Sequence, residues 1–295
     1  MKKFGIDLGG TKIEIIVLDE NNEEIHRKRI PTEQDKGYEH ILDNIEKLYR
    51  ETLEVTFSPE HSLGIGTPGS LSTKTGLLNY SNTTCLNGNP VKKDLEVRLK
   101  RPIVFENDAS CFALAEAQLG AGKGKELCYG VIMGTGCGGK IVLNGKIRNG
   151  PHRGEWGHMI IDPSGPEHFR GFNGVVENYI SGGGLESLYE QQYGEKQLLK
   201  NITDGYRKEE EPYKTFFLNF IEKFGTAYAN LINVLDPDVI VLGGGVSKIN
   251  ELYTIGVQEV QKHFTDPLVE DIIVQHKLGD SAGVLGAALV GSTRS

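Results

Sequence analysis

The chain has 295 residues, of which 38% are hydrophobic, and its formal net charge is −8. It is long enough to form one large domain or two domains of ordinary size, each with a buried core. The excess of acidic residues argues against binding to nucleic acid or to an anionic membrane surface, because phosphate groups would be repelled over most of the exterior.

The cysteines and the first residues indicate a cytoplasmic protein. The four cysteines show no CxxC spacing, and Cys111 and Cys137 lie in apolar or glycine-rich contexts typical of reduced thiols. The opening "MKKFGIDLGG" becomes glycine-rich before a signal-peptide core could form. No apolar run approaches the roughly 18 residues that a membrane-spanning helix needs. We therefore expect neither export nor membrane insertion.

The first half of the chain predicts a meander of strands followed by alternating helices and strands. Apolar β-rich runs separated by Gly-Gly and Asn-Asn turns predict three antiparallel strands over residues 2–30. Residues 37–55 have helical periodicity. Two further strands are expected, one in "SLGIGTPG" and one in "RPIVFEN", and the second leads into a helix at "DASCFALAEAQLG".

The second half of the chain repeats the strand, glycine turn and strand pattern of its first residues. After a Gly/Lys-rich stretch at 120–126, which we interpret as a hinge, "LCYGVIMGTGCGGKIVLNGKI" again gives strand, glycine turn and strand. The polar segment 201–214 is interpreted as a solvated surface connection. "DPDVIVLGGGVSK" predicts a buried strand that ends in three glycines, and "GDSAGVLGAALVG" predicts a helix of small residues that can pack closely.

The glycine turns indicate phosphate binding. "DLGGTK" and "GTGCGG" allow backbone N–H groups to approach an anion, and Thr11 and Thr135 add hydroxyl donors. Rossmann and P-loop motifs are disfavoured, because they need a helix after the glycines and β-branched runs follow here. One such turn is usually only a tight hairpin. Two of them, with a third glycine cluster at Gly243–Gly245, favour a polyphosphate site.

Several polar residues are candidates for catalysis or sugar binding. Asp7 is a candidate to hold Mg²⁺ through water, or else it is an ordinary carboxylate at a strand end. Asp108 is either a general base that accepts a proton from an attacking hydroxyl or the N-cap of the helix that follows it. Glu155 and His158, in "GEWGH", could recognise vicinal hydroxyls or lie on a solvated turn.

Taken together and in this order, these segments resemble the ROK family of repressors, open reading frames and sugar kinases. The landmarks are "DLGGTK", "GIGTPGSL", "NDAS", "MGTGCGG", "GEWGH", "GVVENYISG" and "DPDVIVLGGG". The resemblance implies the actin-like, ribonuclease-H-like ATPase fold, with two α/β lobes around a nucleotide and sugar cleft. We expect a small lobe over 1–120, joined by the C-terminal helix 282–295, and a larger lobe over 121–281.

The resemblance also implies an activity and a set of site residues. Members generally transfer the γ-phosphoryl group of ATP to the 6-hydroxyl of a hexose, with Mg²⁺, and often form homodimers. Asp108 would be the base and Asp7 would hold Mg²⁺. The residues expected around the sugar are Gly69, Ser70, Thr84, Asn107, Glu155, His158 and Glu177. The residues expected around ATP are Gly9, Gly10, Thr11, Lys12, Gly134, Thr135, Gly136, Gly243, Gly244 and Gly245.

The identity of the sugar is less defined. "GTPGSLSTKTGLL", "SNTTCLNGNPVKKDL" and "KLGDSAGVLGAAL" look most like bacterial fructokinases, so fructose is favoured. N-acetylglucosamine kinases come next, and glucokinase or mannokinase activity stays open. The family also contains sugar-responsive repressors, but only three residues precede Phe4, so we expect no helix-turn-helix domain. A sugar-binding protein without catalysis is disfavoured by Asp108 and by the two phosphate turns.

One segment departs from the family pattern. Where the family has a zinc-binding CxCGxxGCxE run, this chain reads "HFRGFNGVVE", with His168, Arg170 and Val175 at the cysteine positions. His158 matches the remaining zinc ligand, but two imidazoles are too few for a structural tetrahedral site. We therefore expect no structural zinc and Mg²⁺ as the only metal. The loop would instead be held by packing of Phe169, Phe172 and Val175 and by hydrogen bonds from Arg170.

Overall fold

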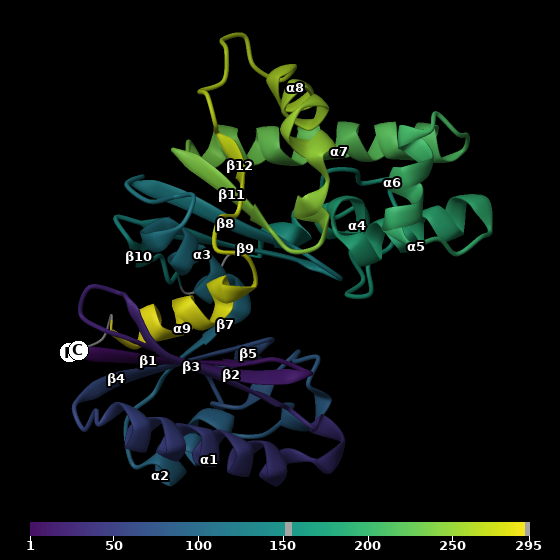
Figure 1. Cartoon of the computed structure of the whole chain (residues 1–295). Helices are drawn as coiled ribbons and strands as arrows, with labels where there is room; N and C mark the ends of the chain where they lie inside the picture. Colours follow the sequence, from purple (N-terminus) through teal and green to yellow (C-terminus); the bar gives the residue numbers. More distant parts are fainter. Residues whose placement is uncertain (151–154, 293–295) are drawn as a thin grey trace. The chain divides into compact units, whose positions relative to one another are not determined.

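The computed structural model describes residues 1–150 and 155–292, which form two compact units (Figure 1). The first unit comprises Met1–Ala115 and Leu278–Ser295, and the second comprises Glu116–Lys277. The chain passes from one unit to the other within helix α3 (Asp108–Leu119) and again just before helix α9 (Ala282–Ser292). The sequence analysis placed these two boundaries at 120/121 and 281/282.

A five-stranded mixed sheet forms the centre of the first unit. Its order is β3-β2-β1-β4-β7, in which β1, β2 and β3 are antiparallel neighbours and β4 and β7 run parallel to β1. The predicted meander is therefore confirmed. The strands are β1 (Lys2–Leu8), β2 (Lys12–Leu18), β3 (Glu24–Pro31), β4 (His61–Thr67) and β7 (Val104–Asn107), with a separate hairpin of β5 (Ser70–Leu71) and β6 (Leu78–Asn79).

Helices cover both faces of this sheet (Figure 1). Phe4, Ile6 and Leu8 on β1 face the core that includes α1 (Tyr38–Thr56) and α2 (Val91–Leu99). The other face meets α9, as the small-residue pattern predicted. A Cβ on Gly5 would lie 2.3 Å from the Ala288 backbone nitrogen, and similar contacts occur at β4. Glycine is needed here because helix and strand backbones touch directly.

The second unit contains a sheet with the same strand order and directions. Its order is β10-β9-β8-β11-β12, in which β8, β9 and β10 are antiparallel and β11 and β12 run parallel to β8. The sheet thus confirms the internal repeat that the sequence predicted. The strands are β8 (Leu127–Met133), β9 (Cys137–Leu143), β10 (Lys146–Ile147), β11 (Val239–Gly243) and β12 (Ile273–Gln275).

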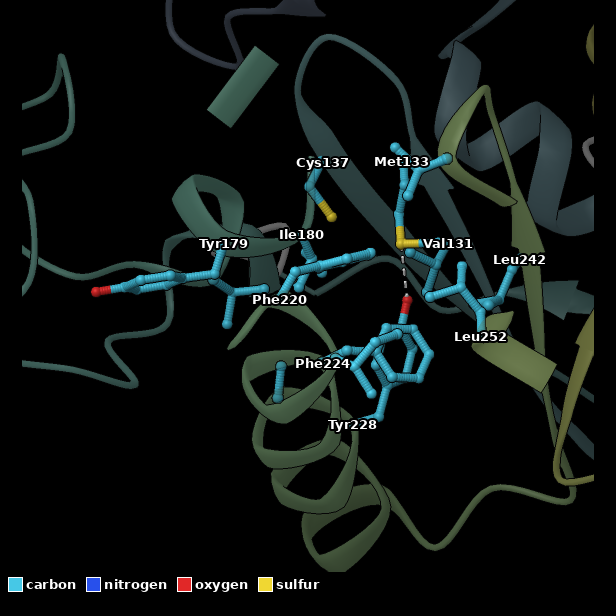
Figure 2. Close-up of a cluster of buried hydrophobic side chains, with 14 of the residues drawn as sticks. Val131, Met133, Cys137, Tyr179, Ile180, Phe220, Phe224, Tyr228, Leu242 and Leu252 are labelled. Atoms are coloured by element: carbon cyan, nitrogen blue, oxygen red, sulfur yellow. Dashed lines mark hydrogen bonds between the residues drawn. The ribbon is translucent and has the colours of Figure 1, made fainter. Parts of the chain in front are cut away.

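The helices of this unit pack around α7, the longest of those the structure describes. Phe220, Phe224 and Tyr228 recur one helical turn apart on α7 and point into a core shared with β8 and β11 (Figure 2). The Tyr228 hydroxyl donates to the Met133 sulfur over 3.3 Å. The helices are α4 (Val176–Ile180), α5 (Gly182–Tyr193), α6 (Leu199–Arg207), α7 (Tyr213–Leu235) and α8 (Ile255–Gln261).

The polar segment 201–214 is only in part the solvated connection that was expected: its first half belongs to helix α6, whereas residues 208–211 are exposed and join α6 to α7. Helix α6 buries Ile202 and Thr203. Tyr206 stacks on Phe217 of α7 with ring centroids 4.2 Å apart. None of the helices in residues 1–150 and 155–292 is both long and apolar enough to cross a membrane.

Short 3₁₀ helices complete the described elements. They are η1 (Gln34–Lys36), η2 (Thr84–Leu86), η3 (Trp156–His158), η4 (Val246–Lys248), η5 (Asn250–Tyr253) and η6 (Gly279–Ser281).

Candidate active site

The first glycine turn joins β1 to β2 in the first unit. The Gly9 N–H donates to the Lys12 carbonyl over 3.0 Å, which closes the hairpin. Thr32, the residue directly after β3, also holds this turn: its hydroxyl donates to the Gly9 carbonyl over 2.7 Å, and its N–H donates to the Thr11 carbonyl over 3.0 Å. A turn fixed in this way can offer backbone N–H groups to an anion without reorganising.

Asp7 and Asp108 lie at the carboxyl end of the parallel strands. Asp7 is on β1 opposite Gly66 of β4, and Asp108 directly follows β7. Desolvation, followed by repulsion from Asp108, raises the pKa of Asp7 to about 6. Desolvation by the surrounding protein also raises the pKa of Asp108, although that residue is exposed and the Ala109 N–H partly offsets the shift. Two neighbouring carboxylates with raised pKa values are typical of a catalytic or cation-binding site.

Asn107, rather than Asp108, caps helix α3. The Asn107 Oδ1 accepts a hydrogen bond from the Ser110 N–H over 2.8 Å, the usual N-cap contact. Asp108 is the first residue of the helix, and its Oδ1 accepts only a local bond from the Ala109 N–H over 2.8 Å. The alternative interpretation of Asp108 as the N-cap is therefore wrong. The Asn107 amide nitrogen would be the group that reaches a substrate.

The segment between β4 and α2 carries three of the residues expected near the sugar. Gly69 has φ +86°, and a Cβ there would lie 2.5 Å from the Asn79 carbonyl oxygen, so only glycine fits. Ser70 lies on β5 and Thr84 opens η2. All three belong to the first unit, the unit that carries Asp7 and Asp108.

The second glycine turn joins β8 to β9 and is tied to the start of α5. The Gly182 N–H donates to the Gly134 carbonyl over 2.7 Å, and the Gly183 N–H donates to the Thr135 carbonyl over 3.2 Å. Ser181 caps α5 by accepting the Gly184 N–H over 3.0 Å. The turn and a capped helix N-terminus thus meet at one place, an arrangement that suits phosphate groups.

A pocket of about 620 Å³ opens beside this turn. It is lined by Gly134, Thr135, Gly182, Gly183, Glu186, Leu199, Lys200, Thr203, Asp204, Arg207, Gly245, Val246, Lys248 and Ile249. Its size, its mixed apolar and charged lining and the adjoining glycine turn fit a nucleoside with its phosphates. The turn next to the pocket requires glycine at position 244, because its φ is +81° and a Cβ would lie 2.3 Å from the Met133 carbonyl oxygen.

Sequence reasoning found only part of this pocket. Gly134, Thr135 and Gly245 were expected and line it, whereas Gly136 and Gly243 do not. A Cβ on Gly136 would instead lie 2.9 Å from a carboxylate oxygen of Glu177. The residues from α5 and α6 were missed. The triple-glycine run at the start of α5 is a signal from which the α5 residues could have been predicted. The polar α6 segment contains no such signal.

Glu155, His158 and Glu177, expected to bind sugar hydroxyls, belong to the second unit. Glu155 is exposed just before η3, and His158 ends that helix. Desolvation and the charge of Arg170 lower the pKa of His158, which favours a neutral ring. Glu177 lies at the start of α4, where its Oε2 accepts the Cys137 N–H over 2.6 Å.

The loop before α4 is held only in part as the sequence analysis expected. Val175 is fully buried, as expected, and the Arg170 backbone N–H donates to His168 Nδ1 over 3.4 Å. Phe169 and Phe172 are 80% and 48% exposed, so the expectation that both rings are buried in the loop is wrong, although Phe169 contacts the His168 ring. Backbone hydrogen bonds and Asp162 hold the loop instead. Asp162 accepts from Lys223 over 2.9 Å and from the Tyr179 hydroxyl over 3.0 Å.

Comparison with known proteins identifies the family. The ROK family model matches residues 3–293. An N-acetyl-D-glucosamine kinase of Haemophilus influenzae is 35% identical over 304 residues, covering 99% of both chains. Another, of Vibrio atlanticus, is 34% identical over 299 residues, covering 97% of this chain and 98% of its own. The chain belongs to the ROK family, and its interpretation as a ROK family sugar kinase is confirmed.

Solved structures agree with this assignment. The ROK hexokinase of Thermus thermophilus superimposes with a TM-score of 0.89 at 29% identity, covering 98% of this chain and 97% of that one. A ROK family glucokinase of Streptomyces griseus, in complex with glucose and AMPPNP, gives 0.73 at 26% identity over 98% and 99%. The expected actin-like ATPase fold is therefore confirmed.

Proposed function

We propose that this protein is an ATP-dependent kinase that transfers the γ-phosphoryl group to the 6-hydroxyl of a hexose. The observation that carries the proposal is the pair of carboxylates with raised pKa values at one sheet edge, Asp7 and Asp108. Asp108 would accept the proton of the sugar hydroxyl as that oxygen attacks, which general-base catalysis requires. Its raised pKa brings the carboxylate closer to the operating pH of such a base.

Asp7 fits the expected magnesium ion. A carboxylate oxygen is the ligand type that Mg²⁺ prefers, and the repulsion between Asp7 and Asp108 would be relieved by a cation. When bound, Mg²⁺ would neutralise charge on the nucleotide phosphates. The pocket beside Gly134 and Thr135 would hold the nucleoside, as its size and the adjoining capped helix support.

The comparisons shift the proposed sugar away from fructose. The fructokinase-like segments favoured fructose, but the relatives at 34–35% identity are named N-acetyl-D-glucosamine kinases. They match along nearly their whole length, whereas the fructokinase resemblance rests on three short segments. We therefore put N-acetyl-D-glucosamine first and fructose, glucose and mannose after it. Glu155, His158 and Glu177 would bind hydroxyls that all of these sugars share.

A coupled assay with ATP, Mg²⁺ and a panel of hexoses tests the proposal. We expect ADP release that depends on the sugar, with the highest kcat/KM for N-acetyl-D-glucosamine. A higher kcat/KM for fructose would make fructose the preferred substrate, as the sequence analysis expected, without changing the reaction class. A protein that binds a sugar, measured by calorimetry, but releases no ADP would instead support the non-catalytic alternative.

A further inference from the structure

The zinc site that the family resemblance implies does not fit this chain. Of the three cysteine positions, Val175 carries no lone pair and is fully buried. Arg170 brings a permanent cation, whose charge already contributes to the lowered pKa of His158. His168 is the only one of the three that could ligate a metal. A contact other than a metal must therefore fix the position of Glu177, beyond the backbone hydrogen bonds and the Asp162 contacts that hold the loop.

The structure shows a direct contact between His168 and Glu177. The His168 ring is 4% exposed, and its Nε2 lies 2.8 Å from Glu177 Oε1. The Arg170 backbone N–H donates to His168 Nδ1 over 3.4 Å. Because Nδ1 accepts there, the proton of a neutral ring is on Nε2, and the ring donates to the glutamate. The ring also packs against Phe169, with centroids 4.1 Å apart.

The loop backbone fixes the position of this imidazole. The His168 N–H donates to the Phe172 carbonyl over 2.7 Å, and the Gly171 N–H returns to the His168 carbonyl over 2.8 Å. Gly171 has φ +80°, so the turn depends on glycine. His168, which stands at the position of the first cysteine, is thus part of a turn closed by two backbone hydrogen bonds.

Both oxygens of Glu177 are consequently held. Oε1 accepts from His168, and Oε2 accepts from the Cys137 N–H over 2.6 Å. Gly136 lets the carboxylate approach the second glycine turn, because a Cβ there would collide with Oε2 at 2.9 Å. A carboxylate fixed at both oxygens can still accept from a sugar hydroxyl through its remaining lone pairs.

We propose that His168 is a positioning residue that takes the place of the missing zinc, by holding Glu177 in the orientation that binds the sugar. The inference rests on the proposed function, because it gives Glu177 a sugar to bind. In the family that this chain resembles, the zinc ion would stiffen the loop without contacting the glutamate. In this chain, the His168 imidazole contacts the glutamate itself.

A divalent metal on His158, His168 and Glu177 is the competing explanation. Their ligand atoms lie within 4.8 Å of one another. Such a site would offer three protein ligands, where a structural zinc site has four, and it would withdraw Glu177 from the sugar. The Arg170 charge near His158 further opposes a cation. The imidazole–carboxylate hydrogen bond needs no additional group, and we therefore favour it.

Two substitutions at His168 test the proposal through sugar binding. His168→Ala should lower kcat/KM for the sugar by about 10- to 100-fold, mainly by raising KM. Losses of this size are found when a residue that orients a binding side chain is removed from a metal site. KM for ATP should stay unchanged. His168→Gln can place an amide donor near the position of Nε2 and should recover most of the loss. The exposed His263→Ala is the matched control and should behave as wild type.

Equal losses in the alanine and glutamine variants, or an equal rise in KM for ATP, would overturn the positioning role. If wild-type protein phosphorylates no hexose, the proposed function fails, and a separate readout still tests the inference. In ¹⁵N-histidine NMR spectra without sugar, His168 should show a protected Nε2–H that Glu177→Ala removes. Elemental analysis should find no stoichiometric zinc or other transition metal. About one zinc per chain, with the Nε2–H signal appearing only after chelation, would overturn the proposal.

Discussion

Replacing Asp7 by asparagine should stabilise the protein while it disables the enzyme. Folding raises the pKa of Asp7 from 3.8 to about 6, so the ionised carboxylate is less favourable in the folded chain than in the unfolded one. At 1.36 kcal/mol per pKa unit the shift corresponds to about 3 kcal/mol. Because Asp7 is only half-buried, solvent screening reduces this to about 2 kcal/mol.

The pH dependence gives the sign of the effect. A carboxyl group whose folded pKa is raised contributes stability below its unfolded pKa of 3.8 and loses that contribution as pH rises through about 6. Wild type and Asp7→Asn should therefore have similar stability near pH 4. Above about pH 7 the variant should be more stable by about 2 kcal/mol, because asparagine cannot ionise.

Urea unfolding of both proteins between pH 4 and pH 8 measures this difference. Asp35→Asn, at an exposed position, is the control and should leave the midpoint at pH 8 unchanged. Mg²⁺ with ATP should raise the midpoint of wild type more than that of the variant, because only wild type offers the carboxylate. A variant less stable than wild type at pH 8, or a difference that does not change with pH, would refute the electrostatic argument.

Three further perturbations probe other parts of the structure. Glu14→Ala removes a buried carboxylate that accepts hydrogen bonds from two partly exposed arginines, and urea unfolding at pH 7 should show a loss of about 1–2 kcal/mol. Desolvation raises the pKa of Glu14, but the hydrogen bonds and charges of the two arginines outweigh it and lower the pKa overall, so that loss should be full above pH 4.5 and shrink at lower pH. Gly64→Ala places a Cβ 1.9 Å from a carbonyl of α9 and should lower stability by about 1–3 kcal/mol in calorimetry, whereas an unchanged Tm would contradict this packing. Glu116→Ala removes the acceptor of two backbone N–H groups, at Ala121 and Lys277, whose hydrogen exchange should accelerate; unchanged exchange would show that these bonds contribute little.

The fold was largely predictable because its signals are local. Apolar runs between glycine turns predict both meanders, and the echo of the first by the second predicts two similar sheets. The dense small residues of α9 predicted a close helix contact, and the glycines of β1 and β4 supply it. Helix α6 was missed because its buried positions are few and lie within a polar run.

The site was less predictable because its contacts join distant parts of the chain. Glycine turns and strand-end carboxylates could be recognised from spacing alone. The packing of α5 and α6 beside the second turn depends on the arrangement of the whole unit, which no local pattern reports. Phe169 and Phe172 were expected to pack because they are large and apolar, but the turn at Gly171 points them outward. The His168–Glu177 contact depends on that same turn.

The role of Asp108 is the claim on which the enzyme mechanism depends most directly. Sugar binding to Asp108→Asn, measured by calorimetry, should remain within a few-fold of wild type, because the isosteric amide keeps the shape of the site. Its kcat in the coupled assay should fall by at least about 100-fold, because general-base help typically contributes 10²- to 10⁴-fold. A variant that binds the sugar and turns over at a near-normal rate would contradict the account.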